Sequence, residues 1–198
     1  MNAIITAKEI KELRDKTAAS ILECKKALVE TNGDINKAVE HLRRRGLSIA
    51  EKKMGKDVSQ GRIASYIHSN GKIGVLVELG CETDFTGNNE LFHELLKDIC
   101  LHIAAMSPVV VSRDQLNQEI IKQEKEFYLK EIKDKPPQIA DKIVEGKLDK
   151  FFYSAKCLLD QPFVKDDKIK VGDLIKNHIA KFGENIVVKR FQRFEIGR

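Results

Sequence analysis

Cysteine and histidine are the residues of this chain with the greatest capacity for chemistry. Their spacing does not match that of a metal site or a redox motif. No two of the four cysteines form a C-x-x-C pair, which argues against a zinc or redox motif. Cys100 and His102 are two residues apart, so on a helix they point to different faces. We therefore expect buried or half-buried thiols in a reducing compartment, at Cys24, Cys81, Cys100 and Cys157.

The other motifs of catalytic sites are missing from the sequence. There is no G-x-x-x-x-G-K-S/T phosphate loop, no G-x-S-x-G and no H-E-x-x-H. Asp166 and Asp167 fall in a lysine-rich segment that we interpret as a solvated loop. A thiol enzyme using Cys81 near His93 is one alternative, but nothing around Cys81 would stabilise a thiolate. The residues thus indicate a binding protein that is not an enzyme and holds no metal or cofactor.

Charge and hydropathy narrow the class further. Among 198 residues, 35 are basic and 30 acidic, and the two signs alternate along the chain. The one dense basic run, Arg43–Arg45, is typical of a solvated helix end, so we expect no direct nucleic-acid binding, although an RNA-binding protein is the main alternative. No apolar run is long enough for a membrane helix, and the first residues resemble neither a secretory signal nor a transit peptide. These features predict a cytoplasmic protein.

The first 53 residues predict three short helices. Thr6 with Glu9, and Ser20 with Glu23, have capping-box spacing at two helix starts. The second helix carries Ile21, Leu22, Cys24 and Leu28 and ends at Asn32-Gly33. Asp34 can cap a third helix, which we expect to end at Gly46. Residues 54–60 follow as a predicted linker to a second domain over 61–198.

The second domain begins with a predicted hairpin. Two alternating segments, 62–68 and 73–79, flank Asn70-Gly71, a pair that favours positive φ at both residues. A loop over 80–89 precedes a strong helix that Pro108 terminates. We expect further helices over 113–132, 138–159 and 171–182. The second has an apolar stripe from Ile139 and Ile143 to Phe152 and an expected interruption at Gly146. A turn at Gln161-Pro162-Phe163 and a β-rich end over 185–196 complete the prediction. The fold class is α+β with an antiparallel hairpin.

Several ordered blocks resemble the elongation factor Ts family. They are LRDKT from Leu13, SILECKKAL from Ser20, NGD from Asn32, CETDF from Cys81, KIVEGK from Lys142, QPFV from Gln161 and RFEIG from Arg193. The resemblance covers nearly the whole chain and is weakest over 109–135. The chain departs from the family pattern at Thr17–Leu22, where two glycines and two methionines are replaced, and at Thr86-Gly87.

This resemblance implies a fold, a function and a set of contact residues. The three helices would form a ubiquitin-associated-like domain that binds elongation factor Tu through Arg14, Ile21 and Leu22. The Thr83-Asp84-Phe85 segment would act in the core domain, with Phe85 wedged between helices of that GTPase near its magnesium. The protein would bind both the GDP-bound and the nucleotide-free GTPase, promote GDP release without covalent chemistry and, as a short family form, work as a homodimer.

Residue burial alone favours other roles for three of these residues. Apolar helix residues are usually core, so Ile21 and Leu22 could belong to the helical bundle. A phenylalanine in a loop is also more often folded inward, which would place Phe85 in the core. The two interpretations of each residue make opposite predictions about its exposure.

Overall fold

The structure of the protein, a computed structural model, describes residues 5–17, 19–132 and 136–197. The chain divides into two compact units. One extends to Asp57 and includes Lys176–Ile186; the other comprises Val58–Ile175 and the chain from Val187 onward. Within the described ranges, no helix combines the length and hydropathy needed to cross a bilayer.

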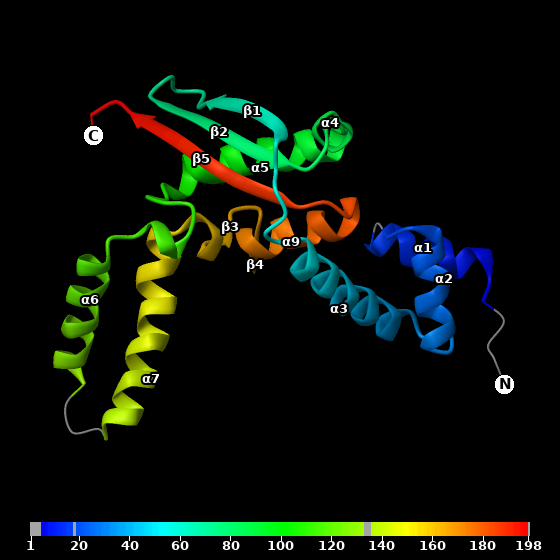
Figure 1. Cartoon of the computed structure of the whole chain (residues 1–198), viewed down its shortest axis with the longest axis horizontal. Coiled ribbons are helices and arrows are strands. Elements are labelled where there is room, and N and C mark those ends of the chain that lie inside the picture. Colours follow the sequence, from blue (N-terminus) through cyan, green and yellow to red (C-terminus); the bar gives the residue numbers. More distant parts are fainter. Residues whose placement is uncertain (1–4, 18, 133–135, 198) are drawn as a thin grey trace. The chain divides into compact units, whose positions relative to one another are not determined.

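The first unit contains three consecutive helices whose starts follow the predicted caps. They are α1 (Ala7–Thr17), α2 (Ile21–Glu30) and α3 (Ile35–Lys53) (Figure 1). The Thr6 amide donates to the Glu9 carboxylate at 2.7 Å, and the Glu9 amide donates back to the Thr6 hydroxyl at 3.3 Å. The Ser20 hydroxyl and the Asp34 carboxylate accept from amides in the first turns of α2 and α3. The Thr6–Glu9 capping box and the Ser20 and Asp34 caps supply acceptors to amides that have no partner within the helix.

The centre of this unit is a cluster of small and medium apolar side chains. Its fully or almost fully buried members are Leu13, Cys24, Ala27, Leu28 and Ala38. Half-buried side chains surround them, at Ile5, Ile10, Ala19, Ile35, Val39 and Leu42. The helices of this unit therefore share one core, although likeness to a ubiquitin-associated domain stays a prediction.

The expected helix end at Gly46 is wrong, because α3 continues to Lys53. A Cβ atom at Gly46 would lie 3.1 Å from the Cβ of Ala180 in α9 (Val171–Phe182), so the glycine permits close packing of two helices. The Asn185 side chain donates to the Lys56 carbonyl at 2.7 Å and so joins the segments that follow these two helices. The Arg43–Arg45 run consequently lies inside a helix and not at its end.

The second unit is built on a three-stranded sheet, in the order β1 (Gln60–Ile67), β2 (Ile73–Cys81), β5 (Ile186–Glu195) (Figure 1). β1 and β2 are antiparallel, with Ile67 opposite Gly74. β5 is antiparallel to β2, since the Ile196 amide donates to the Lys72 carbonyl while Arg190 pairs with Glu78. Helix α5 (Glu90–Met106) packs against β1 and β2. This mixture of helices and an antiparallel sheet agrees with the predicted α+β class.

The hairpin turn differs from its prediction in one residue. Gly71 has a φ of 66°, but Asn70 keeps a negative φ. The His68 carbonyl accepts from the Gly71 amide at 2.8 Å, and the His68 amide donates to Ile73 at 2.9 Å. These bonds close a four-residue loop, which needs a left-handed residue only at the glycine.

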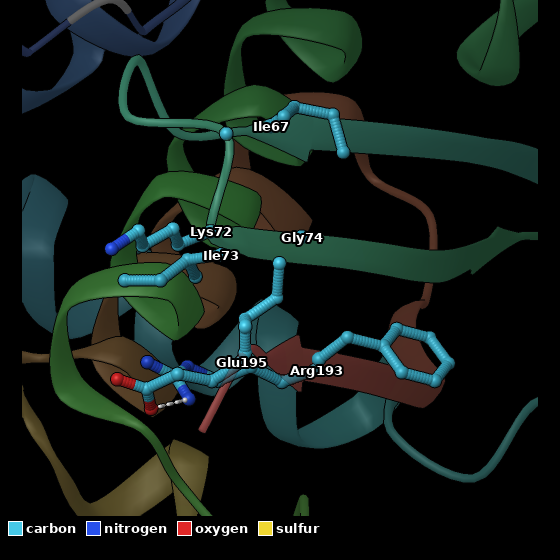
Figure 2. A pocket seen from close by; sticks show the side chains of 9 residues that line it. Ile67, Lys72, Ile73, Gly74, Arg193 and Glu195 are labelled. Carbon is cyan, nitrogen blue, oxygen red and sulfur yellow. Dashed lines mark hydrogen bonds and ion pairs between the residues drawn. The ribbon is translucent and has the colours of Figure 1, made fainter. Parts of the chain in front are cut away.

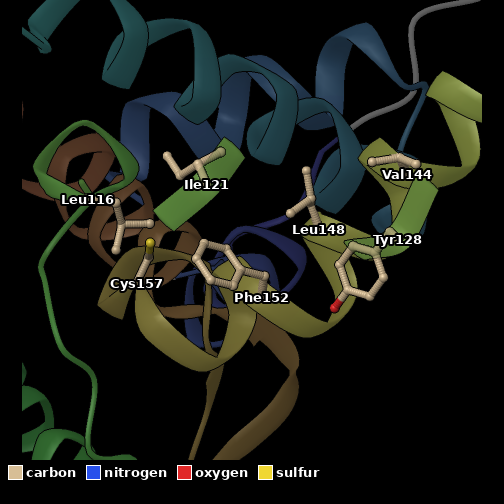
Figure 3. Close-up of a cluster of buried hydrophobic side chains, with 7 residues drawn as sticks. All are labelled: Leu116, Ile121, Tyr128, Val144, Leu148, Phe152 and Cys157. Atoms are coloured by element: carbon tan, nitrogen blue, oxygen red, sulfur yellow. The ribbon is translucent and has the colours of Figure 1, made fainter. Parts of the chain in front are cut away.

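Two further helices form a pair away from the sheet. They are α6 (Gln118–Glu131), preceded by the turn η1 (Arg113–Gln115), and α7 (Pro137–Lys147). α7 runs into a π-helical segment, η2 (Leu148–Tyr153), then α8 (Ser154–Lys156) and η3 (Leu158–Asp160). Their shared core, shown in Figure 3, consists of Leu116, Ile121, Tyr128, Val144, Leu148, Phe152 and Cys157. The single helix expected over 113–132 is wrong in detail, because its first residues form η1. The helix expected over 138–159 changes to π-helical geometry at Leu148, close to the interruption expected at Gly146.

The apolar stripe of α7 also differs from the prediction. Ile139 is exposed and Ile143 only half-buried, whereas Ala140 and Val144 are buried. Ala140, Val144, Leu148 and Phe152 recur every four residues, so they share one helix face. The smaller residues of that face lie inward because they continue the stripe of Leu148 and Phe152.

The turn and loop expected over 161–170 form a small antiparallel pair, β3 (Pro162–Phe163) with β4 (Asp166–Lys170). Gln161 explains their position. Its buried side-chain oxygen lies 2.9 Å from Nε2 of buried His102, whose Nδ1 accepts from the Val164 amide at 3.2 Å. This network attaches the pair to α5. The predictions for α9 and for a terminal strand are confirmed.

Candidate partner-binding surface

Phe85 lies on a single helical turn, α4 (Asp84–Gly87), where a loop was expected. The Thr83 hydroxyl caps this turn by accepting from the Thr86 amide at 3.4 Å. Phe85 is 85% exposed, more than the other large apolar side chains in the described part of the chain. Thr86 and Gly87 face inward and are buried. The interpretation of Phe85 as a core residue is therefore wrong.

Buried contacts beneath α4 fix its position. The Cys81 thiol, fully buried, donates to the Thr83 carbonyl at 3.0 Å. A Cβ atom at Gly87 would lie 3.4 Å from the Cys81 sulfur, so the turn rests directly on the end of β2. Asn89 begins α5 immediately afterwards by accepting from the Leu91 amide at 2.9 Å. A strand, a turn and a helix start thus hold the segment that presents Phe85.

The exposed end of α4 combines an aromatic ring with a carboxylate. Asp84 is exposed next to Phe85, and its backbone carbonyl accepts from the Asn88 amide at 2.8 Å. In the described residues, no cluster of three histidine, cysteine or acidic side chains could hold a metal ion. An exposed aromatic ring on a fixed turn fits the anchor of a protein–protein contact.

The second group of predicted contact residues lies in the first unit, at the adjoining ends of α1 and α2. Ile21 and Leu22 are 58% and 60% exposed, and Arg14 is exposed in the last turn of α1. The buried residues of α2 are instead Cys24, Ala27 and Leu28. The interpretation of Ile21 and Leu22 as bundle core is therefore wrong, because both side chains are exposed to solvent.

One apolar surface has no counterpart among the sequence predictions. The sheet face away from α5, which we call the outer sheet face, exposes large apolar side chains on all three strands and at the end of β5. They are Ile63, Ile67, Leu76, Phe194 and Ile196. A solvated face of an antiparallel sheet is usually polar. Alternation of apolar residues in β1 was visible in the sequence, but not which face α5 covers.

A hollow lies at the end of the sheet beside the β1–β2 turn. Figure 2 shows this hollow of about 510 Å³, where side chains from the β1–β2 turn lie near the end of β5. Ile67, Ile73 and Phe194 contribute apolar walls. Arg193 donates to Glu195 at 2.7 Å and to the Ala104 carbonyl of α5, so its charge is paired.

The thiols fit the expected structural role. All four cysteines are free and buried. Burial raises the pKa of both Cys100 and Cys157 to about 11, so these thiols stay protonated at neutral pH. The thiol of Cys81 donates to a backbone carbonyl, and His93 is exposed. This arrangement gives no support to a thiol enzyme.

The basic run of α3 is largely paired with acidic side chains. Arg44 lies 3.2 Å from Glu40, and Arg45 lies 3.0 Å from Glu23 of α2. Both pairs reduce the positive charge that a nucleic acid would meet. The RNA-binding alternative thus receives no support from this segment.

Comparison with known proteins agrees with the ordered blocks of the sequence. A family model described as Elongation factor TS matches residues 3–198. Proteins named Elongation factor Ts from Thermodesulfovibrio yellowstonii and Thermosipho melanesiensis are each 54% identical to the chain, covering 98% of it and 97% and 100% of their own lengths. One from Coprothermobacter proteolyticus is 52% identical, with 98% of both chains covered. Because the family model and these relatives extend over almost the whole sequence, the chain belongs to the elongation factor Ts family.

Proposed function

We propose that this protein is a guanine nucleotide exchange factor for elongation factor Tu. It binds the GTPase and promotes GDP release during translation elongation, without forming or breaking a covalent bond. Membership of a translation factor family supports this proposal. The single observation that carries it is the exposed ring of Phe85 on a turn fixed from below by Cys81.

In this proposal, Phe85 is the wedge. Its ring enters between helices of the GTPase near the bound magnesium, while Asp84 and Thr83 orient the turn. The 85% exposure of Phe85 leaves almost the whole ring available for burial in a partner. Burying a phenylalanine side chain contributes a free energy on the order of 2–3 kcal/mol to binding. That free energy can be used to disturb the magnesium and phosphate site of the GTPase.

The helical unit supplies the second contact. Ile21 and Leu22 bury their exposed side chains against the nucleotide domain of the GTPase, and Arg14 adds a charged contact beside them. Two apolar anchors beside an arginine have the composition of a small binding hot spot. The ubiquitin-associated-like character of residues 1–53 and the 54–60 linker belong to the same proposal.

Thermodynamic linkage explains how binding becomes exchange. A factor that favours the nucleotide-free GTPase weakens GDP binding, and GDP weakens binding of the factor by the same ratio. GDP therefore leaves quickly from a transient ternary complex, and GTP then displaces the factor. No side chain of this protein has to change its protonation state.

The test is release of a fluorescent GDP analogue from elongation factor Tu at catalytic ratios of the factor. We expect wild-type protein to accelerate release strongly and Phe85→Ala to lose most of that acceleration while remaining folded. Phe127→Ala is the matched control, because Phe127 is an exposed phenylalanine on α6 outside the proposed contacts. No acceleration by folded wild-type protein would contradict the proposal, and equal loss in both variants would contradict the wedge.

We also propose that the protein is a homodimer that pairs through the outer sheet face. Apolar side chains such as Ile67, Leu76 and Phe194 would be covered by the same residues of a second copy, as an isologous interface requires. Leu76→Lys should convert the dimer to a monomer in analytical ultracentrifugation. Lys165→Ala, which breaks an ion pair with Asp98 of α5, should leave the mass unchanged.

We place the protein in the cytoplasm, where its partner acts, with no membrane partner and no direct contact with nucleic acid. The paired arginines of α3 support the last point. A shallow dependence of any residual RNA affinity on salt would agree, whereas a steep one would favour the RNA-binding alternative.

A further inference from the structure

We propose that Arg62 is a positioning residue for exchange: it holds the Phe85 turn in place through Asn88 without contacting the GTPase itself. This inference rests on the proposed function of Phe85. It concerns Asn88, the residue that follows α4.

Two hydrogen bonds fix the Arg62 side chain across the gap between β1 and α4. One guanidinium nitrogen, Nη1, donates to the Gly61 carbonyl of its own strand at 2.9 Å. The other, Nη2, donates to the side-chain oxygen of Asn88. Because the guanidinium is planar, it makes both bonds in one orientation and keeps Asn88 at a fixed position relative to β1.

Asn88 is the residue at which α4 ends. Its backbone amide donates to the Asp84 carbonyl at 2.8 Å, and that bond closes the helical turn. A side chain that fixes Asn88 therefore fixes the closing bond of the turn on which Phe85 is mounted. The charge of Arg62 strengthens the link, since hydrogen bonds to an ionised donor exceed neutral ones.

A turn of four residues needs such support. A helix this short has no stability of its own, because nucleation costs more than one turn of hydrogen bonds returns. Phe85 cannot help, since its ring is almost fully exposed and packs against little. Cys81 supports the turn from below, at Thr83 and Gly87, and the Thr83 hydroxyl caps its start. Arg62 adds a side-chain hydrogen bond to Asn88, just after its end.

The backbone conformation of Gly61, directly before Arg62, lets the start of β1 approach β2 closely. At Gly61, φ is 152°, and an added Cβ atom would lie 2.2 Å from the Leu79 carbonyl oxygen. Only glycine allows this approach of β1 to β2. Arg62 follows directly, opposite Leu79 in the strand register, at the end of β1 next to α4.

The first experiment measures accelerated GDP release. Arg62→Ala should lower the acceleration about fivefold, as expected for a partly solvated hydrogen bond from a charged group. Asn88→Ala should reproduce that loss, while the control Lys165→Ala should have no effect. Unchanged exchange by Arg62→Ala would overturn the proposal.

A double-mutant cycle separates positioning from direct contact. On a Phe85→Ala background, Arg62→Ala should cause no further loss, because the ring that it positions is gone. The same fivefold loss on both backgrounds would mean that Arg62 touches the GTPase, which would overturn the positioning role.

A third measurement needs no GTPase and so remains valid if the proposed function fails. The chain contains no tryptophan, so Phe85→Trp places its one tryptophan on the turn, where it can be excited apart from the three tyrosines. Adding Arg62→Ala should lower its fluorescence anisotropy, with the far-UV circular dichroism spectrum unchanged. Unchanged anisotropy would overturn the positioning role, whereas lowered anisotropy with no exchange by wild-type protein would refute only the exchange function.

Discussion

Replacing His102 by leucine should destabilise the protein at neutral pH, and by less in acid. His102 is fully buried on α5, and its ring makes two hydrogen bonds. Nε2 donates to the Gln161 side-chain oxygen at 2.9 Å, and Nδ1 accepts from the Val164 amide at 3.2 Å. This pattern requires a neutral ring with its proton on Nε2.

The magnitude follows from the two groups that lose their partner. Leucine has a similar size but leaves the Gln161 oxygen and the Val164 amide without their bonds to the ring. A buried polar group left without a hydrogen bond costs about 1–3 kcal/mol. Gln161 is buried and Val164 is partly solvated, so we expect the free energy of unfolding to fall by about 3 kcal/mol. His93→Leu, an exposed position on the same helix, should change it by less than about 0.5 kcal/mol.

The pH dependence has a definite sign. Burial lowers the pKa of His102, and the hydrogen bond to Gln161 opposes this only in part. Above the ordinary histidine pKa of about 6.5, both folded and unfolded states are neutral and the full contribution is present. Below it the unfolded state takes up the proton first, so wild-type stability falls by up to about 1.4 kcal/mol per pH unit relative to the variant.

Urea unfolding of wild type and His102→Leu at pH 7.5 and pH 5.5 tests both parts. The stability difference should be about 3 kcal/mol at the higher pH and clearly smaller at the lower. Other titrating groups are common to both proteins and cancel. A difference that is small at pH 7.5, or equal at both pH values, would refute the reasoning.

Three further predictions concern other parts of the molecule. Gly61→Ala should lower the free energy of unfolding by about 3 kcal/mol, measured in urea, because its Cβ would overlap the Leu79 carbonyl. Arg113→Ala should cost about 1 kcal/mol, since its bonds to Asp160 are partly solvated. The same variant should raise the pKa of Asp160, which Arg113 lowers mainly by hydrogen bonding, so the difference in stability should vanish in acid; an NMR titration of that carboxyl checks this. Leu22→Ser should leave stability within about 0.5 kcal/mol yet weaken binding to elongation factor Tu in calorimetry.

Local signals predicted the element order well where the deciding interactions are close in sequence. Caps at Thr6, Ser20 and Asp34 involve residues three positions apart, and each formed as expected. Contacts between distant segments decided the errors. In the sequence, Gly46 predicts a helix end, but in the structure it allows α3 to pack closely against Ala180 of α9. In the sequence, Gln161 predicts a turn, but in the structure its hydrogen bond to His102 attaches the β3–β4 pair to α5.

The candidate site divides in the same way. The CETDF block, with a phenylalanine next to a carboxylate, could be recognised from the sequence, because residue identity carries that information. Whether Phe85, Ile21 and Leu22 point outward depended on which faces the cores of the two units bury, and burial is decided by tertiary packing. Arg62 and Asn88 are 26 positions apart, and only the folded chain brings them together to fix the turn.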